Sequence, residues 1–366
     1  MEKLYTLLAL TISFGVSAQI TVENTTASGT LSTAIGYFTE ASGDGSTAMG
    51  VDTTASGLEA TAMGYNTVSS GVRSTAVGSE TTSSGDFSTA MGLVTTASGT
   101  DATAMGAFTE ASGNTSTAMG RTTEASGIYS TAMGVLTTAS GNMSTAMGAS
   151  TVASGNTSTA MGYSTEASGG YSTAMGFYTT ASGIRSTAMG FYTTASDYGS
   201  LVIGRSNLLG STVTNSATEF STDNTAFVIG NGANTDNRSD ALTVLFDGTT
   251  TIAGDLSINS DARLKANIIS LGSTLAKVLQ IDGKSYTMKK DENKKQKIGV
   301  LAQDIEKVFP ELVSESNGIK SVNYQGLVPV LINALKEQQT EIEILKEQQT
   351  EIDELKEMVQ ALISRK

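Results

Sequence analysis

A 14-residue unit repeats without insertion through the first half of the chain. A glycine closes the motif Ser-Thr-Ala-Met-Gly, or a near variant, thirteen times between Gly36 and Gly204. A second glycine lies halfway along each unit, and Asp197 takes its place in the last one. A glycine every seven residues argues against helices, because each costs about 1 kcal/mol relative to alanine. The repeat therefore predicts two short strands and two tight turns per unit, which make one coil of a parallel β-solenoid.

Variation among the copies indicates which residues of the first strand face solvent. The position of Glu40 carries Thr, Val or Glu in other units. A site that accepts all three residue types is expected on the surface. Because side chains alternate along a strand, Thr39 and Ala41 are then expected to point inward.

The second strand is restricted on both faces. Ile or Val replaces Met49 in some copies, so we expect Thr47 and Met49 to fill the interior of the coil. A row of Met at solenoid spacing is more typical of core filling than of a metal site. The opposite face, Ser46 and Ala48, carries only small residues, which indicates close approach by another backbone. Each coil has few apolar side chains for its own interior, and a small core favours oligomerisation. We therefore infer that a neighbouring chain packs against Ser46 and Ala48. The alternative is a monomeric solenoid in which small residues allow tight stacking.

Composition excludes several kinds of chemistry. The chain has no His and no Cys, which removes His-based acid–base catalysis, the usual zinc sites, thiol nucleophiles and disulfides. No cofactor or metal is predicted. The net charge of −13 argues against nucleic acid as a partner. Residues 260–366 hold 16 basic and 16 acidic residues, so all the net charge precedes Ser260 and a domain boundary is expected there.

The first 18 residues have the pattern of a signal peptide. Lys3 precedes the mostly apolar run 4–16, and the small residues Ser17 and Ala18 follow. A buried first strand or helix is the alternative. No later run approaches the ~20 apolar residues of a membrane helix. We therefore expect an exported protein, secreted or at the cell surface, with no integral membrane anchor in this chain.

Beyond the repeats, the pattern changes twice. Residues 205–259 lose the period and predict an irregular β neck with strands near 227–232 and 241–246. Residues 260–366 predict a small α+β domain with a helix within 271–279, strands at 284–288 and 298–302, and a short helix from Asp304 to Pro310. The final helix, about 327–366, carries an apolar stripe that favours a coiled coil, with a lone solvated helix as the alternative. The stripe comprises Leu335, Ile342, Leu345, Ile352, Leu355, Val359 and Leu362.

The repeats resemble the heads of YadA-type trimeric adhesins. Units such as 116–120 followed by 123–127, Ser-Thr-Ala-Met-Gly and Thr-Glu-Ala-Ser-Gly, carry the resemblance. It implies a left-handed parallel β-roll over residues 19–204, assembled as a homotrimer. Those adhesins end in a membrane-embedded anchor that this sequence does not resemble, so anchoring is not carried over.

The C-terminal domain resembles the endosialidase-type intramolecular chaperone of phage tail spikes. The resemblance rests on four motifs in order: 260–265 (Ser-Asp-x-Arg-Leu-Lys), 298–303 (Ile-Gly-Val-Leu-Ala-Gln), 308–313 (Val-Phe-Pro-Glu-Leu-Val) and 322–331 (Val-Asn-Tyr, then Leu-Val-Pro-Val-Leu). Members of this family assemble trimeric β-fibres and then cut themselves off through a Ser–Lys pair. The resemblance implies Ser260 and Lys265 as that catalytic pair. Asp261 and Arg263 are expected to be structural or orienting.

A Ser–Lys pair also has a chemical rationale that does not depend on the family resemblance. A Ser hydroxyl is a weak nucleophile, and in a chain without His a desolvated lysine is the available base. Five residues separate Ser260 from Lys265, so the two side chains can meet across a turn. Any such activity is single-turnover cleavage beside Ser260, and no multi-turnover enzyme is expected.

These features lead to one main functional hypothesis and two alternatives. The first is an exported, adhesin-like homotrimeric fibre whose C-terminal domain directs assembly and releases itself. Non-local β-assembly is slow and prone to register errors, which a trimerising domain would correct. The second is a trimeric glycan- or surface-binding solenoid that keeps an inactive chaperone domain. The third is an ice-binding Thr array, which the outward Glu40, Val68 and Glu110 would interrupt. A host surface, matrix or glycan is the expected type of ligand.

Overall fold

The computed structural model describes residues 23–209, 216–289 and 294–364. The predicted signal segment, residues 1–18, lies outside the described residues. The chain divides into two compact units, one ending at Leu256 and the other beginning at Ser257.

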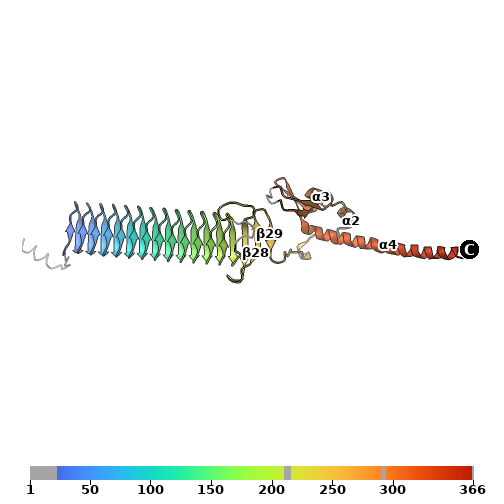
Figure 1. Ribbon diagram of the computed structural model, residues 1–366, viewed down its shortest axis with the longest axis horizontal. Coiled ribbons are helices and arrows are strands. Elements are labelled where there is room, and N and C mark those ends of the chain that lie inside the picture. The colour runs from blue at the N-terminus through green and yellow to red at the C-terminus, as the bar shows by residue number, and fades with distance from the viewer. Residues whose placement is uncertain (1–22, 210–215, 290–293, 365–366) are drawn as a thin grey trace, which may run out of the picture. The chain divides into compact units, whose positions relative to one another are not determined.

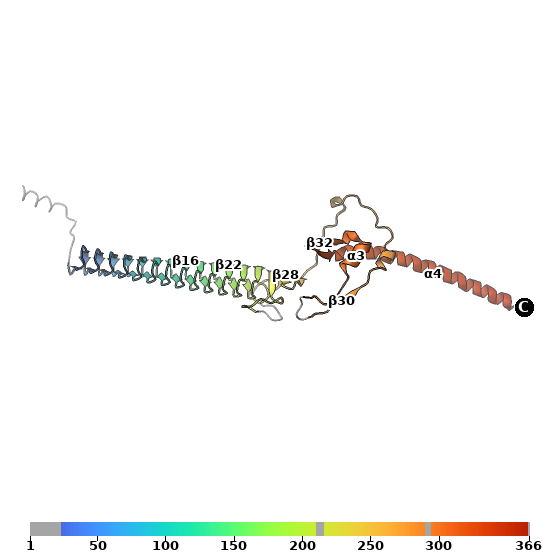
Figure 2. The same ribbon diagram turned by 90° about the horizontal axis from the view of Figure 1, so that it is seen from above.

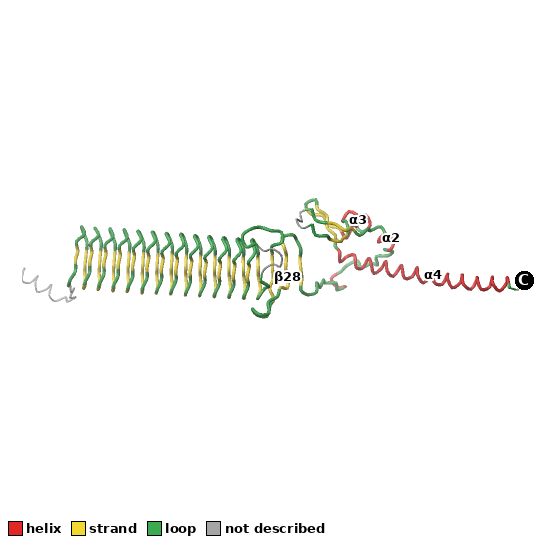
Figure 3. Tube along the Cα trace, viewed as in Figure 1, coloured by secondary structure: helices red, strands yellow, loops and turns green. Residues whose placement is uncertain are grey.

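The first unit is a stack of coils, each contributing one strand to each of two sheets (Figure 1). Figure 3 shows the strands in the middle of the stack and the loops along both of its edges. Strands pair in parallel with those 14 residues further on, so that Thr117 lies opposite Thr131. The predicted mainly β fold and its 14-residue solenoid period are therefore confirmed.

The two strands of a coil differ in length. The five-residue strands form the larger sheet: β2 (Thr33–Tyr37), β4 (Thr47–Val51), β6 (Thr61–Tyr65), β8 (Thr75–Ser79), β10 (Thr89–Leu93), β12 (Thr103–Ala107), β14 (Thr117–Arg121), β16 (Thr131–Val135), β18 (Thr145–Ala149), β20 (Thr159–Tyr163), β22 (Thr173–Phe177), β24 (Thr187–Phe191) and β26 (Leu201–Arg205). The two-residue strands form the smaller sheet: β1 (Thr26–Ala27), β3 (Glu40–Ala41), β5 (Thr54–Ala55), β7 (Val68–Ser69), β9 (Thr82–Ser83), β11 (Thr96–Ala97), β13 (Glu110–Ala111), β15 (Glu124–Ala125), β17 (Thr138–Ala139), β19 (Val152–Ala153), β21 (Glu166–Ala167), β23 (Thr180–Ala181) and β25 (Thr194–Ala195).

The motif glycines stand directly over one another along the stack. Gly120 has a φ of +125°, and a Cβ added to it would lie 2.0 Å from the carbonyl oxygen of Gly134 in the next coil. Both the backbone conformation and the spacing of the coils therefore require glycine at this position.

The outer corners of the coils tolerate other residues at positive φ. Glu59, Val94 and Tyr129 have φ values of 55°, 52° and 58°. Each donates its backbone N–H to a carbonyl of the preceding coil, at 2.7, 2.8 and 2.9 Å respectively. The backbone bonds thus hold these corners whatever side chain stands there.

The faces of the longer strands are the reverse of those expected from the sequence. Ser46 and Ala48 are fully buried, and the equivalent Ala is at 0% exposure in every coil from Ala48 to Ala188. Thr47 is only half-buried, and Met49 is 38% exposed. The Ser/Ala face therefore lines the interior of its own coil, where its alanines pack together with the alanines of the smaller sheet. The Thr/Met face points outward.

The faces of the shorter strands match the sequence prediction. Thr39 and Ala41 are buried at 1% and 0% exposure, whereas Glu40 between them is exposed. The interior of the solenoid is consequently a thin layer of Ala, Ser, Thr and Gly.

The larger sheet continues past the last coil, but the smaller one ends at β25. Strand β26 pairs in parallel with β27 (Thr225–Asn231). Strands β28 (Asp240–Leu245) and β29 (Thr250–Ile252) then add in antiparallel fashion. Strands occur where the neck was expected to have them, and they extend the larger sheet of the head.

The second unit is a small α+β fold built on the first turns of a long helix. Its elements are η1 (Ala262–Leu264), α2 (Leu275–Val278), β30 (Lys284–Tyr286), β31 (Lys297–Gly299), α3 (Ala302–Val308), η2 (Pro310–Leu312), β32 (Val313–Ser316), β33 (Ile319–Val322), η3 (Tyr324–Gly326) and α4 (Leu327–Ile363). Ile305, Val308, Phe309 and Val330 form its core. Figure 2 shows α4 running on well beyond the smaller elements.

Several expected elements of this unit are present with different bounds. The helix expected within 271–279 is four residues long, and the hairpin of β32 and β33 was not predicted. Helix α4 begins at Leu327 as expected.

Candidate functional site

A tight turn brings Ser260 and Lys265 together. Asp261 caps the 3-10 helix η1 by accepting the backbone N–H of Arg263, and the N–H of Lys265 bonds to the carbonyl of Ala262. This geometry folds the chain back, so that Lys265 Nζ lies 2.6 Å from Ser260 Oγ. The structure thus places the predicted nucleophile and base in hydrogen-bond contact.

An ion pair fixes the shape of the turn. Arg263 Nη2 lies 2.6 Å from Asp261 Oδ2, and Arg263 Nε lies 3.1 Å from both carboxylate oxygens. These hydrogen bonds from Arg263 hold the pKa of Asp261 below its ordinary value, because they stabilise the charged form. Asp261 thus contacts the backbone between Ser260 and Lys265, and Arg263 holds the Asp261 carboxylate; an orienting role for both residues stays a prediction.

The surroundings of the pair are open in a single chain. Ser260 and Lys265 are exposed, and so are three apolar neighbours: Leu264 at 71%, Ile268 at 66% and Ile269 at 86%. Exposed apolar side chains next to the pair in the sequence mark a surface that another chain is suited to cover.

Glu337 of α4 anchors the segment that follows the turn. Its carboxylate accepts the Ser273 hydroxyl at 2.6 Å, the Thr274 N–H at 2.6 Å and the Leu275 N–H at 3.2 Å. These donors, Ser273 foremost, lower the pKa of Glu337. Sequence reasoning missed this residue, because one Glu among many on α4 carries no signal.

The other C-terminal motifs have structural roles. Tyr324 accepts the N–H of Val300 on its hydroxyl at 3.1 Å, which ties the 298–303 and 322–324 motifs together. A Cβ on Gly299 would lie 2.7 Å from the same hydroxyl oxygen, so a larger residue there would displace the end of the Tyr324 side chain. Asn323 accepts the N–H of Gly326 and caps η3.

An aromatic column occupies one corner of the head. Tyr163, Phe177 and Phe191 stack with ring centroids 5.0 Å apart at each step. A second column, Tyr178 on Tyr192 at 4.9 Å, stands beside it and could have been found from the same 14-residue spacing. Because the rings cover one another's faces, the columns stabilise the stack and leave few ring faces for a ligand.

The head repeats and the domain that begins at Ser260 each match a known family. Residues 27–53, 41–67, 55–81, 69–93, 97–123, 125–151, 153–179 and 181–207 match the YadA head domain repeat. Residues 260–314 match the chaperone of endosialidase family. This chain is therefore similar to YadA heads over residues 27–207 and to the chaperone of endosialidase over residues 260–314. The chaperone match begins at Ser260 itself and includes the whole turn up to Lys265.

A phage fibre protein is also similar to this chain. The long tail fiber protein Gp37 of Escherichia phage AR1 is 31% identical over 100 residues, which is 25% of this chain and 9% of that protein. The chain therefore spans less than a tenth of that relative's length. Within residues 23–209, 216–289 and 294–364, no helix is both long and apolar enough to cross a membrane. No group of three or more acidic side chains within these described ranges is arranged to hold a metal ion.

Proposed function

We propose that this protein is an exported homotrimeric surface fibre with an adhesin-like role. Its chaperone domain directs assembly of the trimer and then releases itself by cleavage next to Ser260. The YadA head, the endosialidase chaperone and the similarity to a phage tail fibre all support this class of protein.

The outward Thr/Met face of the head is the observation that carries the trimer proposal. It repeats once per coil along the larger sheet, with Met49 and Met91 each 38% exposed and the other Met residues half-buried. A continuous row of apolar side chains outside a thin interior is suited to packing against copies of itself.

The C-terminal helix supports the same assembly. Every residue of the predicted apolar stripe on α4 is exposed, with Leu335, Leu345 and Leu362 between 62% and 66%. Helices with such a stripe associate in water as coiled coils. Three copies of α4 would hold three chains together while the slower head finds its register.

The Ser260–Lys265 contact supports the cleavage step. A neutral Lys265 amine would take the proton of Ser260 Oγ as this oxygen attacks a backbone carbonyl carbon adjacent to the turn. The C–N bond would break, the leaving amine would take the proton from the lysine ammonium, and water would hydrolyse the resulting ester. A lysine stays neutral more readily away from water. We therefore place cleavage after assembly, when neighbouring chains cover Leu264, Ile268 and Ile269.

One experiment separates this function from a retained, inactive chaperone. The full chain, Ser260→Ala and the control Ser257→Ala are expressed, and the native mass and the denaturing gel pattern of each are compared. We expect a trimer in all three, and a fragment of about 107 residues, the length of 260–366, in the wild type and the control only. A fragment that persists in Ser260→Ala would exclude Ser260 as the nucleophile.

The remaining outcomes are equally decisive. Trimers without cleavage in the wild type would favour the glycan- or surface-binding solenoid with an inactive domain. A native mass of one chain, 37.6 kDa, would overturn the fibre proposal itself.

A further inference from the structure

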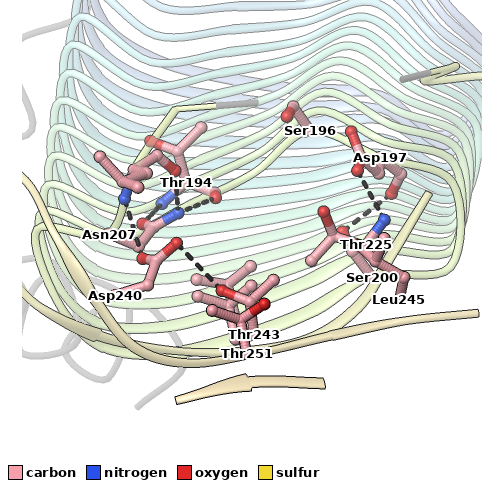
Figure 4. A pocket seen from close by; sticks show the side chains of 13 residues that line it. Thr194, Ser196, Asp197, Ser200, Asn207, Thr225, Asp240, Thr243, Leu245 and Thr251 are labelled. Atoms are coloured by element: carbon pink, nitrogen blue, oxygen red, sulfur yellow. Dashed lines mark hydrogen bonds between the residues drawn. The ribbon is translucent and has the colours of Figure 1, made fainter. Parts of the chain in front are cut away.

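A cavity of about 240 Å³ lies at the end of the head, below the last coil. It forms because the smaller sheet stops at β25 while the larger sheet continues through β27, β28 and β29. The cavity therefore occupies the position that a further short strand of the smaller sheet would fill, and side chains surround it. Figure 4 shows these side chains converging on the cavity from the last coil and from the strands that follow it.

The edge of the smaller sheet is already capped on one side of the cavity. Asn207 accepts the N–H of Thr194 at 2.8 Å and donates its amide to the carbonyl of Thr194 at 2.9 Å. Its side chain thus replaces the backbone of a missing coil. Asn207 is fully used in this way and has little capacity left for a ligand.

Two carboxylates of the cavity have spare acceptor capacity. Asp197 is 2% exposed; its Oδ2 accepts the N–H of Thr225 at 2.8 Å, but its Oδ1 has no hydrogen-bond partner. Asp240 accepts the N–H of Leu208 at 2.9 Å on Oδ1, and its Oδ2 has only a long contact of 3.4 Å with the Thr243 hydroxyl. A buried carboxylate oxygen without a donor is costly, so Asp197 Oδ1 favours a cationic donor. Asp240 is half-buried, and its Oδ2 can accept a second donor in place of its long contact.

Among the residues that the structure describes, no cation neutralises this pair. Lys and Arg are absent from the residues that line the cavity, and neither carboxylate forms an ion pair with any residue in the described ranges. The nearby guanidinium of Arg238 donates to the carbonyls of Tyr192 and Asn207 instead. Burial raises the pKa of Asp240, as expected for a carboxyl that lacks a counter-charge.

The positions of the two carboxylates limit the shape of an occupant. Asp197 and Asp240 lie on opposite sides of the cavity (Figure 4). Val202, Val228 and Leu245 also line it and supply apolar surface. A cavity of about 240 Å³ is much larger than a single water or a bare metal ion requires. An apolar chain with a positive group at each end matches this arrangement.

We propose that this cavity binds a small linear diammonium ion, with one ammonium group at Asp197, the other at Asp240, and the methylene chain over Val202 and Val228. This site is separate from the Ser260–Lys265 pair and does not depend on cleavage.

Titration calorimetry on the full-length wild-type protein tests the shape requirement first. The probes are 1,5-diaminopentane, pentylamine, 1,5-pentanediol and calcium chloride. We expect the diamine to bind at least about tenfold more tightly than the monoamine, since each charge-assisted hydrogen bond adds roughly that factor. The diol is expected not to bind. Equal binding of the mono- and diamine, tighter binding of calcium, or no binding of the diamine would each overturn the proposal.

Substitution then locates the site. Asp240→Asn keeps an acceptor for the Leu208 N–H but removes the charge, and it should weaken diamine binding about tenfold or more. Asp86→Asn is the matched control, because Asp86 also accepts a backbone N–H, that of Val72 at 2.9 Å, but lies on the surface of the head. Equal diamine affinities in the two variants would place the site elsewhere and refute the assignment. If Asp240→Asn fails to fold, the probe series on the wild type still decides.

Discussion

Replacing Gly120 with alanine tests whether the glycine rows are set by contact between coils. The new Cβ would lie 2.0 Å from the Gly134 oxygen, whereas ordinary contact begins near 3.4 Å, so the two coils would have to separate. Two backbone bonds flank this point: Thr117 N–H to Ser130 O at 2.9 Å, and Leu136 N–H to Arg121 O at 3.0 Å. A separation of the coils would weaken both bonds.

The expected loss of stability combines strain and weakened bonds. A φ of +125° costs an alanine about 1–3 kcal/mol. Each of the two weakened bonds adds about 0.5–1.5 kcal/mol. The head should therefore lose roughly 2–6 kcal/mol per chain, unless the strain breaks the stack into two separately unfolding parts.

Guanidinium unfolding of the full chain, followed by circular dichroism of the β signal, measures this loss. Gly170→Ala is the matched control, because a Cβ there has no heavy atom within 4 Å and the φ of Gly170 is not positive. We expect that control to stay within about 0.5 kcal/mol of the wild type or to be slightly more stable. Unfolding midpoints that agree between Gly120→Ala and Gly170→Ala would refute the reasoning.

Three further predictions address assembly, cleavage and pH. Met133→Glu, on the outward Thr/Met face, should shift the native mass from the trimer toward 37.6 kDa, whereas Thr138→Glu on the smaller sheet should not, because Glu110 and Glu124 already lie side by side there; equal masses for both variants would contradict this interface. Asp261→Ala should slow the release of the C-terminal fragment about tenfold without changing the native mass, because the cap that brings Lys265 to Ser260 is lost; an unchanged rate on a time-course gel would remove the turn from the mechanism. Because the pKa of Glu337 lies below its ordinary value of 4.5, the contribution of Glu337 to stability is fully present above pH 4.5 and is lost as the pH falls further. Thermal melts of the C-terminal unit should therefore depend less on pH in this acid range for Glu337→Gln than for the wild type. Parallel pH profiles of the two proteins would exclude this role of Glu337.

The period of the sequence was sufficient to predict the coil but not the direction of every side chain. Spacing placed Thr39, Glu40 and Ala41 correctly, because the tolerance of Glu at one position identifies the solvent side. The Thr47/Met49 and Ser46/Ala48 faces are both restricted, and small size indicates only that something approaches closely. The Ser46/Ala48 face is in fact approached by the other sheet of the same coil. The distance between the two sheets depends on the tertiary fold, so a local sequence pattern does not predict it.

The candidate site shows the same limit. The five-residue spacing and the motif were sufficient to pair Ser260 with Lys265. Glu337, which anchors the next segment, lies far along the chain, and its role depends on how α2 meets α4. Asp197 was visible as a break in the glycine row, yet its function as a cap on Thr225 appears only where the smaller sheet ends.

The uniform register of the coils makes the head a molecular ruler. Adjacent strands lie about 4.8 Å apart, and each coil touches only its two neighbours. Loss or duplication of one 14-residue unit in the gene would therefore shorten or lengthen the head by that step and leave both ends intact. Nearly identical repeats favour recombination of this kind. The length of the head can therefore evolve independently of the side chains that its corner residues expose to solvent.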